Sequence, residues 1–199
     1  MRKSVAADVA SKDELIFAEA VRIFRAKGYH ATSMRNIADA VGLQKASLYH
    51  YIPSKEALLF KIFERSSGAL TQQLEAIVAS HDSPPDKLRC AIESHLIALC
   101  DQLDTYTVYL SERRALGNRY HAKVRAEGEK HARLIEQMLQ EGIAHKDFRA
   151  LDTKMVALAI LGMCNWLYQW YSPEGRLTPQ QIAAIFSDVV IAGLARTKK

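Results

Sequence analysis

The sequence predicts an all-α protein, for three reasons. Its 199 residues include only five prolines and nine glycines, so few positions are forced into turns. No stretch alternates apolar and polar residues with the two-residue period of a strand. Apolar residues recur instead at helical spacing in segment after segment. A chain of this length buries a substantial core in one or two domains.

The first helix is predicted from about Lys12 to Lys27. Ser11-Lys-Asp-Glu14 has the form of a capping box, and Gly28 supplies a left-handed residue that ends the helix. The apolar stripe of this helix contains Leu15, Ile16, Ala20, Ile23 and Phe24.

Residues 32–51 are typical of two short helices joined by a tight turn. Ala38 is small where two helices approach closely, Gly42 lies where the chain turns, and Leu48 is an apolar anchor of the second helix. This spacing is that of a helix-turn-helix, whose second helix enters the major groove of DNA. An ordinary helical hairpin is the alternative. Ile52-Pro53 then breaks the second helix, and Ser54 caps the next one.

The residues that carry a family resemblance extend from Gly28 to Leu58. They are Gly28-Tyr29, Thr32, Ile37-Ala38, Val41-Gly42, Leu48-Tyr49-His50-Tyr51 and Ser54-Lys55-Glu56-Ala57-Leu58. This run closely resembles the amino-terminal domain of tetracycline-repressor (TetR) family regulators, and the match covers about the first 60 residues without a gap. At the position of Ile52 the family usually has Phe, and both side chains are apolar. The resemblance implies a TetR-like architecture, with a DNA-binding head in residues 1–54 and a ligand-binding and dimerisation domain in residues 55–199.

The second helix of the pair, about Gln44 to Tyr51, is short, so its exposed face near the start must read DNA. Gln44, Lys45 and Ser47 are the candidates for base contacts, since Gln pairs with adenine and Lys with guanine. The resemblance assigns phosphate contacts to Thr32, Ser33, Tyr49, His50 and Lys55. Arg35 could reach either a base or a phosphate. Thr32, Ser33 and Ser54 could instead be simple helix caps.

The charge distribution agrees with DNA binding but does not demand it. The net charge is +5, and residues 1–60 carry nine Lys or Arg against six Asp or Glu, a net of +3. Positive charge is therefore denser at the amino-terminal end, as phosphate binding requires. A solvated surface would explain the same excess.

The remaining chain is predicted to form six helices. Their ranges are about 54–80, 86–102, 105–116, 120–145, 153–171 and 179–196, with a break at His81-Asp-Ser-Pro-Pro85. From Met155 to Leu167 every residue except Asn165 is apolar or Gly, and 13 residues are too few to span a bilayer. Thr178-Pro-Gln-Gln181 is a second capping box before another apolar stripe. Two such helices per chain predict a homodimer through a four-helix interface, with a monomer whose helix is covered within the chain as the alternative.

Residues 162–177 resemble a signature in the branch of the family that senses acyl-CoA thioesters. The implied ligand residues are Asn165, Trp166, Trp170 and Tyr171, with Arg113 as a partner for CoA phosphates. The aromatic residues could enclose an acyl chain or pack in the core and interface. Asn165 could orient a ligand or satisfy backbone groups, and Arg113 could be an ordinary surface residue.

Other sites are not predicted. The amino-terminal segment lacks the apolar core of a signal peptide, so a cytoplasmic protein without a membrane segment is expected. Three cysteines without a Cys-x-x-Cys pair argue against disulfides and zinc, and favour buried thiols over a redox sensor. No two histidines have His-x-x-x-His spacing, so neither a metal nor a cofactor is expected.

Together these features predict a regulator, not an enzyme. It would bind a palindromic double-stranded operator as a homodimer, acting as a repressor in the family's usual mode, and a small molecule such as an acyl-CoA would release it. The alternatives are a thioesterase-like enzyme that binds acyl-CoA and a DNA-binding protein without sequence preference. No Gly-x-Ser-x-Gly elbow or glycine-rich nucleotide loop supports an enzyme.

Overall fold

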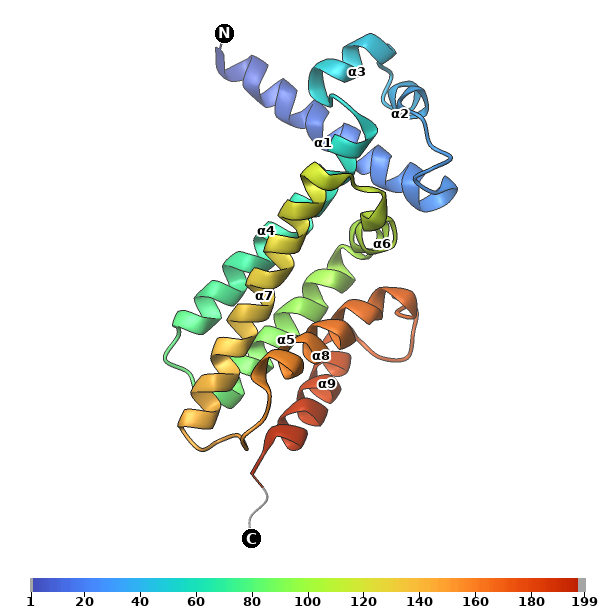
Figure 1. Cartoon of the computed structure of the whole chain (residues 1–199). Helices are drawn as coiled ribbons and strands as arrows, with labels where there is room; N and C mark the ends of the chain where they lie inside the picture. Colours follow the sequence, from blue (N-terminus) through green and yellow to red (C-terminus); the bar gives the residue numbers. More distant parts are fainter. Residues whose placement is uncertain (1, 197–199) are drawn as a thin grey trace. The chain divides into compact units, whose positions relative to one another are not determined.

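The computed structural model describes residues 2–196, with side chains from residue 12 onward. Within this range the chain forms nine α-helices, and its β-pairing is an isolated bridge between Phe148 and Ala195. The helices are α1 (Arg2–Lys27), α2 (Met34–Ala40), α3 (Lys45–Tyr51), α4 (Lys55–Ala79), α5 (Pro84–Asp101), α6 (Leu103–Glu112), α7 (Asn118–Ala144), α8 (Thr153–Trp166) and α9 (Pro179–Leu194) (Figure 1). The predicted all-α, nine-helix architecture is confirmed.

The helices divide between two compact units. The head unit contains the chain up to Arg65 together with Asp104–Ala122, and the bundle unit contains Ser66–Leu103 and the chain from Lys123 onward. Both divisions at Arg65 and Ala122 fall inside helices, α4 and α7. The head unit therefore includes α6 and the first turn of α7, which are far from α1–α3 in sequence.

Helix α1 packs on the head core through Ile16, Ala20 and Phe24, and it ends at Gly28, whose φ is +80°. Two predictions about it are wrong. The helix begins at Arg2 instead of Lys12, because the preceding residues are Ala-rich and lack Gly or Pro. Ser11 therefore lies within a helix, and its side chain is outside the described residues. Leu15, expected in the buried stripe, is 43% exposed.

Long-range contacts tie α4 to the rest of the head unit. Arg65 forms two hydrogen bonds with Glu14, at 2.8 and 2.7 Å, and lies 4.2 Å from the Phe17 ring centroid. The hydrogen bonds from Arg65 lower the pKa of Glu14. Phe60 stacks on Tyr120 with ring centroids 4.5 Å apart. Apolar and charged contacts thus join α1, α4 and α7 in this unit.

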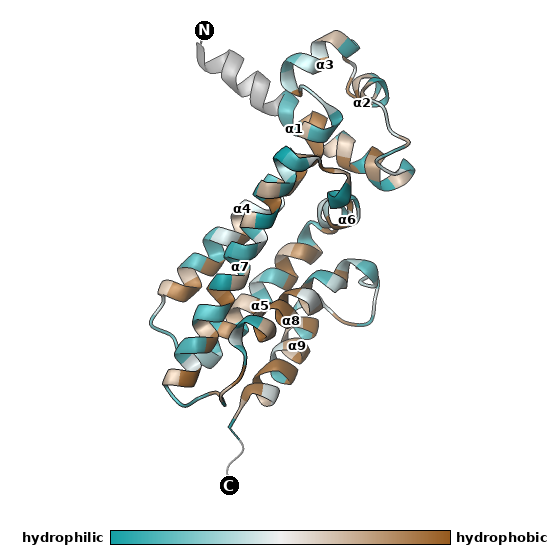
Figure 2. Cartoon of the chain, viewed as in Figure 1, coloured by the Kyte–Doolittle hydropathy of each residue, from teal (hydrophilic) through white to brown (hydrophobic). Residues whose placement is uncertain are grey.

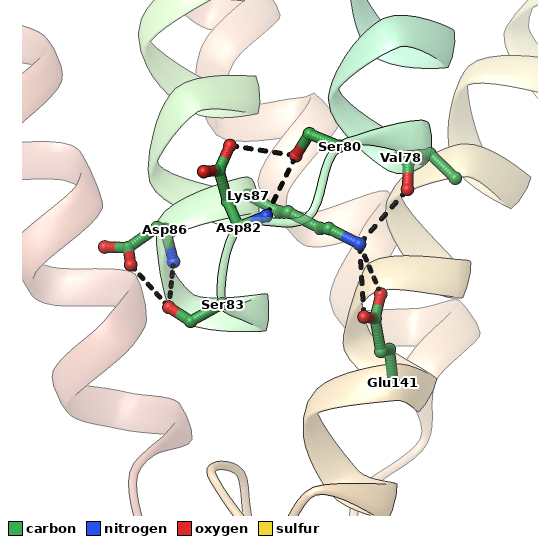
Figure 3. Close-up of polar contacts among 7 residues, drawn as sticks. All are labelled: Val78, Ser80, Asp82, Ser83, Asp86, Lys87 and Glu141. Atoms are coloured by element: carbon green, nitrogen blue, oxygen red, sulfur yellow. Dashed lines mark hydrogen bonds and ion pairs between the residues drawn. The ribbon is translucent and has the colours of Figure 1, made fainter.

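The bundle unit packs its helices around an apolar core that includes Leu70, Leu74, Ala91 and Met138. One cation lies inside this unit. Lys87, 4% exposed, donates to Val78 O at 3.1 Å and to both Glu141 carboxylate oxygens at 3.0 and 3.1 Å, so it joins α4, α5 and α7 (Figure 3). A buried ammonium must have such partners, because desolvating an unpaired charge is costly.

At the ends of the bundle helices, the predicted cap at Thr178 is confirmed, and a cap at Ser83 was not predicted. Ser83 caps α5, and Thr178 caps α9 in a complete capping box with Gln181. Helix α8 was predicted to reach Tyr171 but ends at Trp166, where the chain tightens into a 3₁₀ turn over Leu167–Gln169. This turn precedes Pro173, which cannot continue a helix. None of the described helices has the length and hydropathy of a membrane span.

Candidate DNA-binding face and ligand site

The turn between α2 and α3 has the predicted geometry. Ser33 caps α2 in a reciprocal pair with Asn36, and Gly42 adopts a φ of +66° that side chains rarely tolerate. The Leu43 amide donates to Ala38 O at 2.9 Å and closes the turn. Ala38 and Leu48 are completely buried, so α2 and α3 are held together by their apolar sides.

The opposite side of α3 faces solvent. Gln44, Lys45, Tyr49 and His50 are exposed or partly exposed at this side, and Ser47 is half-buried. The Lys45 ammonium lies 6.0 Å from the Tyr49 ring centroid, at the outer limit of a cation–π contact. This short helix therefore presents hydrogen-bonding side chains and one aromatic ring on a rigid apolar support.

Arg35 lies in the first turn of α2, and Ser33 caps that helix. The Arg35 side chain is 80% exposed, and its Nε lies 3.9 Å from Asp39, too far for a hydrogen bond. Its guanidinium is therefore available to an external acceptor. The Ser33 hydroxyl is exposed to solvent but bonds Asn36, so it has a capping role in the structure.

Thr32 and Lys55, both predicted to contact phosphate, are engaged within the chain. Thr32 is 2% exposed and its hydroxyl donates to Gly28 O at 2.8 Å. The Lys55 ammonium donates to Tyr29 O and Thr32 O, both at 2.7 Å, and lies 4.3 Å from the Tyr29 ring centroid. These contacts hold the loop between α1 and α2. The sequence suggested no such role for Lys55, because its partners lie 23 and 26 positions away.

The candidate ligand residues do not share one environment. Arg113 belongs to the head unit, while the other four belong to the bundle unit. Trp166 and Trp170 are 61% and 50% exposed. Tyr171 is half-buried and hydrogen-bonded to Cys100, and the Asn165 amide oxygen is 3.1 Å from the His95 Nε2. The structure thus places Asn165 and Tyr171 against α5 and leaves the two tryptophans at the surface.

A polar cluster in the bundle interior was not identified from the sequence. Thr71 on α4 contacts the carboxylate of Glu127, lies 2.6 Å from the His131 Nε2 and donates to Ser67 O at 3.0 Å. Burial lowers the pKa of His131. Burial also lowers the pKa of His95 to about 4, assisted by the nearby His131. Both imidazoles are consequently neutral hydrogen-bonding groups at neutral pH.

Helices α8 and α9 expose large apolar side chains. Six of the eight exposed large hydrophobic residues in the described chain lie here or directly after α8: Met155, Leu158, Trp166, Trp170, Ile185 and Val189. Their spacing within each helix favours one side, and both helices are largely brown in Figure 2. Gly162 and Gly193 continue these rows, and a methyl group added at either would meet no atom within 4 Å. We call this surface the α8–α9 face.

Comparisons with known protein families agree with this arrangement. Residues 16–62 match the description "Bacterial regulatory proteins, tetR family", and residues 81–194 match "Tetracyclin repressor-like, C-terminal domain". The chain belongs to the TetR family. The transcriptional repressor KstR2 of Mycolicibacterium smegmatis is 26% identical over 191 residues, which cover 95% of this chain and 93% of the relative.

Solved structures of TetR-family proteins share the fold. The regulator PfmR from Thermus thermophilus is 30% identical with a TM-score of 0.84, covering 91% of this chain and 99% of PfmR. AibR, solved in complex with isovaleryl coenzyme A and operator DNA, is 29% identical with a TM-score of 0.81, covering 89% of this chain and 97% of AibR. The predicted family is therefore confirmed, and this TetR-family chain has relatives that are transcriptional regulators.

Proposed function

We propose that this TetR-family chain represses transcription by binding a palindromic operator as a homodimer, and that a small-molecule effector releases it. The observation that carries the proposal is the outward, hydrogen-bonding side of α3 on a completely buried apolar support at Leu48. A division into a DNA-binding part, residues 1–54, and an effector-binding and dimerisation part, residues 55–199, accompanies it. Such a regulator would act in the cytoplasm, with the chromosome.

Within the DNA-binding part, the side chains differ in role. Gln44, Lys45 and Ser47 would read base edges, and Tyr49 and His50 would contact phosphates. Arg35 and Ser33 would add contacts from α2. We assign Thr32 and Lys55 to holding the loop that presents Ser33, because their donors already have partners in the chain.

The test begins with selection of a binding site from a random duplex library, followed by anisotropy titrations at several salt concentrations. Replacing Gln44 or Lys45 should change the preferred sequence, whereas Tyr49→Phe should weaken binding to all sequences alike. Arg176→Ala is the control, because it removes one exposed charge from the loop before α9. If no sequence is enriched, the protein binds DNA without preference and the operator proposal fails.

Dimerisation would occur through the α8–α9 face. Exposed apolar side chains in rows on two helices, with glycines where another helix could approach, suit a four-helix interface between two copies. We therefore assign Trp166 and Trp170 to this interface. Analytical ultracentrifugation at micromolar concentration tests the assignment, and a purely monomeric protein contradicts it.

The effector is proposed to be an acyl-CoA bound in the bundle unit. AibR supports this choice, since it was solved with isovaleryl coenzyme A and operator DNA. Asn165 and Tyr171 are the predicted ligand residues of the bundle unit that lie against α5. Arg113 belongs to the head unit and is not assigned to this site. A thermal-shift panel of CoA thioesters, followed by measured DNA release, tests this proposal. Free thiol appearing in the same mixtures would indicate a thioesterase instead.

The proposed mechanism requires only a modest free-energy coupling between effector binding and operator binding. A 100-fold weakening of operator binding corresponds to about 2.7 kcal/mol of differential effector binding. A ligand that raises the melting temperature but does not release DNA would separate effector binding from regulation.

A further inference from the structure

A groove between α4 and α5 of the bundle unit has no role in the function proposed above. Its volume is about 370 Å³, within the range of roughly 300 to 1,000 Å³ that small-molecule sites have. Ala69 on α4 and Ile97 and Ala98 on α5 contribute to its lining. The groove therefore offers apolar contact to a hydrocarbon chain.

Two carboxylates, Glu93 and Asp101, also line the groove. They lie eight positions apart on α5, which corresponds to about 12 Å along the helix axis. Ile97 lies midway between them in sequence and lines the groove as well. The lining thus has an acidic group towards each end and an apolar middle.

Neither carboxylate is neutralised within the part of the chain whose side chains are described. Glu93 and Asp101 take part in none of its ion pairs. Arg89 on α5 is bound to Asp188 at 2.8 Å, and Lys130 on α7 is bound to Glu75 at 2.7 Å. Arg89 and Lys130 are thus paired with other acids. The carboxylates of Glu93 and Asp101 are therefore available to a ligand.

The negative charges of Glu93 and Asp101 also affect the pKa values of two neighbouring thiols. Burial raises the pKa of Cys90, and Asp82 and Glu93 raise it further. Burial raises the pKa of Cys100 to about 11, with a further contribution from Asp101. Burial disfavours any charged group at these positions, but the electrostatic contributions of Glu93 and Asp101 have the sign that attracts a cation.

We propose that the groove binds a linear diammonium ion, with one ammonium at Glu93, the other at Asp101 and the carbon chain over Ile97 and Ala98. Each ammonium would gain a charge-assisted hydrogen bond, and the methylene chain would bury apolar surface. The same carboxylates repel a polyanionic acyl-CoA. We therefore assign the groove to a cation and not to the proposed effector.

Calorimetric titration of the full chain at fixed ionic strength tests the proposal with three amines. α,ω-Diaminooctane should bind at least about tenfold more tightly than α,ω-diaminobutane or octylamine, because only it can place an ammonium at both acids. Glu93→Gln and Asp101→Asn should each weaken its binding by about tenfold. Glu174→Gln removes the same charge from an exposed loop position and should change nothing.

Ala98→Leu supplies an uncharged test of location, because a larger side chain fills the groove and should abolish binding. Equal affinity for the three amines would indicate attraction to surface charge alone and would overturn the proposal. Unchanged binding in the Glu93→Gln and Asp101→Asn proteins would do the same. Neither acid has an ion-pair partner to lose among the described side chains, so both variants should keep the unfolding temperature of the parent protein.

Discussion

Helix α3 in the head unit and helices α8 and α9 in the bundle unit both turn large side chains to solvent, but these side chains differ in kind. Helix α3 and its cap expose Gln44, Lys45, Tyr49 and His50, whereas the α8–α9 face exposes Met, Leu, Ile, Val and Trp. Hydrogen-bonding groups suit a hydrated, charged polymer, and apolar groups suit another protein surface. The contrast shows that exposure alone does not identify a partner, because the chemistry of the exposed group decides.

The strongest effect should come from placing a charge on the α8–α9 face. Val189→Glu should convert the dimer to a monomer and weaken operator binding by about 1,000-fold, towards nonspecific binding. Sedimentation and anisotropy measure the two effects. Gln72→Glu, at an exposed position of α4, adds the same charge and should leave both unchanged. If the Val189→Glu protein still sediments as a dimer, the α8–α9 face is not the dimer interface, and the proposed difference in partner between this face and α3 is wrong.

A second prediction concerns the buried His95 of the bundle unit. The pKa of His95 is lowered to about 4 in the folded chain, below its unfolded value near 6.5. The unfolded state therefore binds the extra proton first as the pH falls, and stability decreases between pH 6.5 and 4 by about 3 kcal/mol. Chemical unfolding across this range should show the loss, and His95→Gln should reduce the slope.

A third prediction contrasts two lysines of the head unit. Lys55→Met removes an ammonium bonded to three backbone carbonyls and should destabilise the head by about 2 kcal/mol. Lys45→Met should leave stability unchanged and alter only the preferred DNA sequence, since Lys45 faces solvent beside Tyr49. Guanidinium unfolding and operator titrations on both variants separate the roles. Equal loss of stability in the two variants would contradict the assignment of Lys55 to the loop.

The weakest effect concerns Arg35. Its guanidinium is exposed and only loosely paired, so Arg35→Ala should not destabilise the fold. If Arg35 contacts phosphate, the salt dependence of operator binding should decrease by about one unit of slope. A changed base preference with the original slope would instead place Arg35 at a base edge. Either result defines what α2 adds to the polar side of α3.

Predictions made from the sequence were most accurate where neighbours in the chain decide the structure. The positive φ values of Gly28 and Gly42 and the capping box at Thr178 depend on residues a few positions away. The start of α1 and the end of α8 were placed wrongly, because a plausible cap at Ser11 was overridden by an Ala-rich extension and the α8 helix tightened into a 3₁₀ turn. Leu15 was misplaced because helical spacing alone does not define the edge of a buried face.

Local spacing and capping were sufficient to predict the helical architecture and the helix-turn-helix, and the resemblance carried by residues 28–58 indicated the family. Only the packing of helices that are distant in sequence showed which polar groups have partners within the chain and which face solvent. The Lys87–Glu141 pair joins residues 54 positions apart, and the Thr71–His131 contact joins residues 60 apart. The same packing gives Lys55 its place in a loop and leaves Lys45 facing solvent. Burial and pairing arise when separate segments meet, and neither is encoded in the spacing of any one of them.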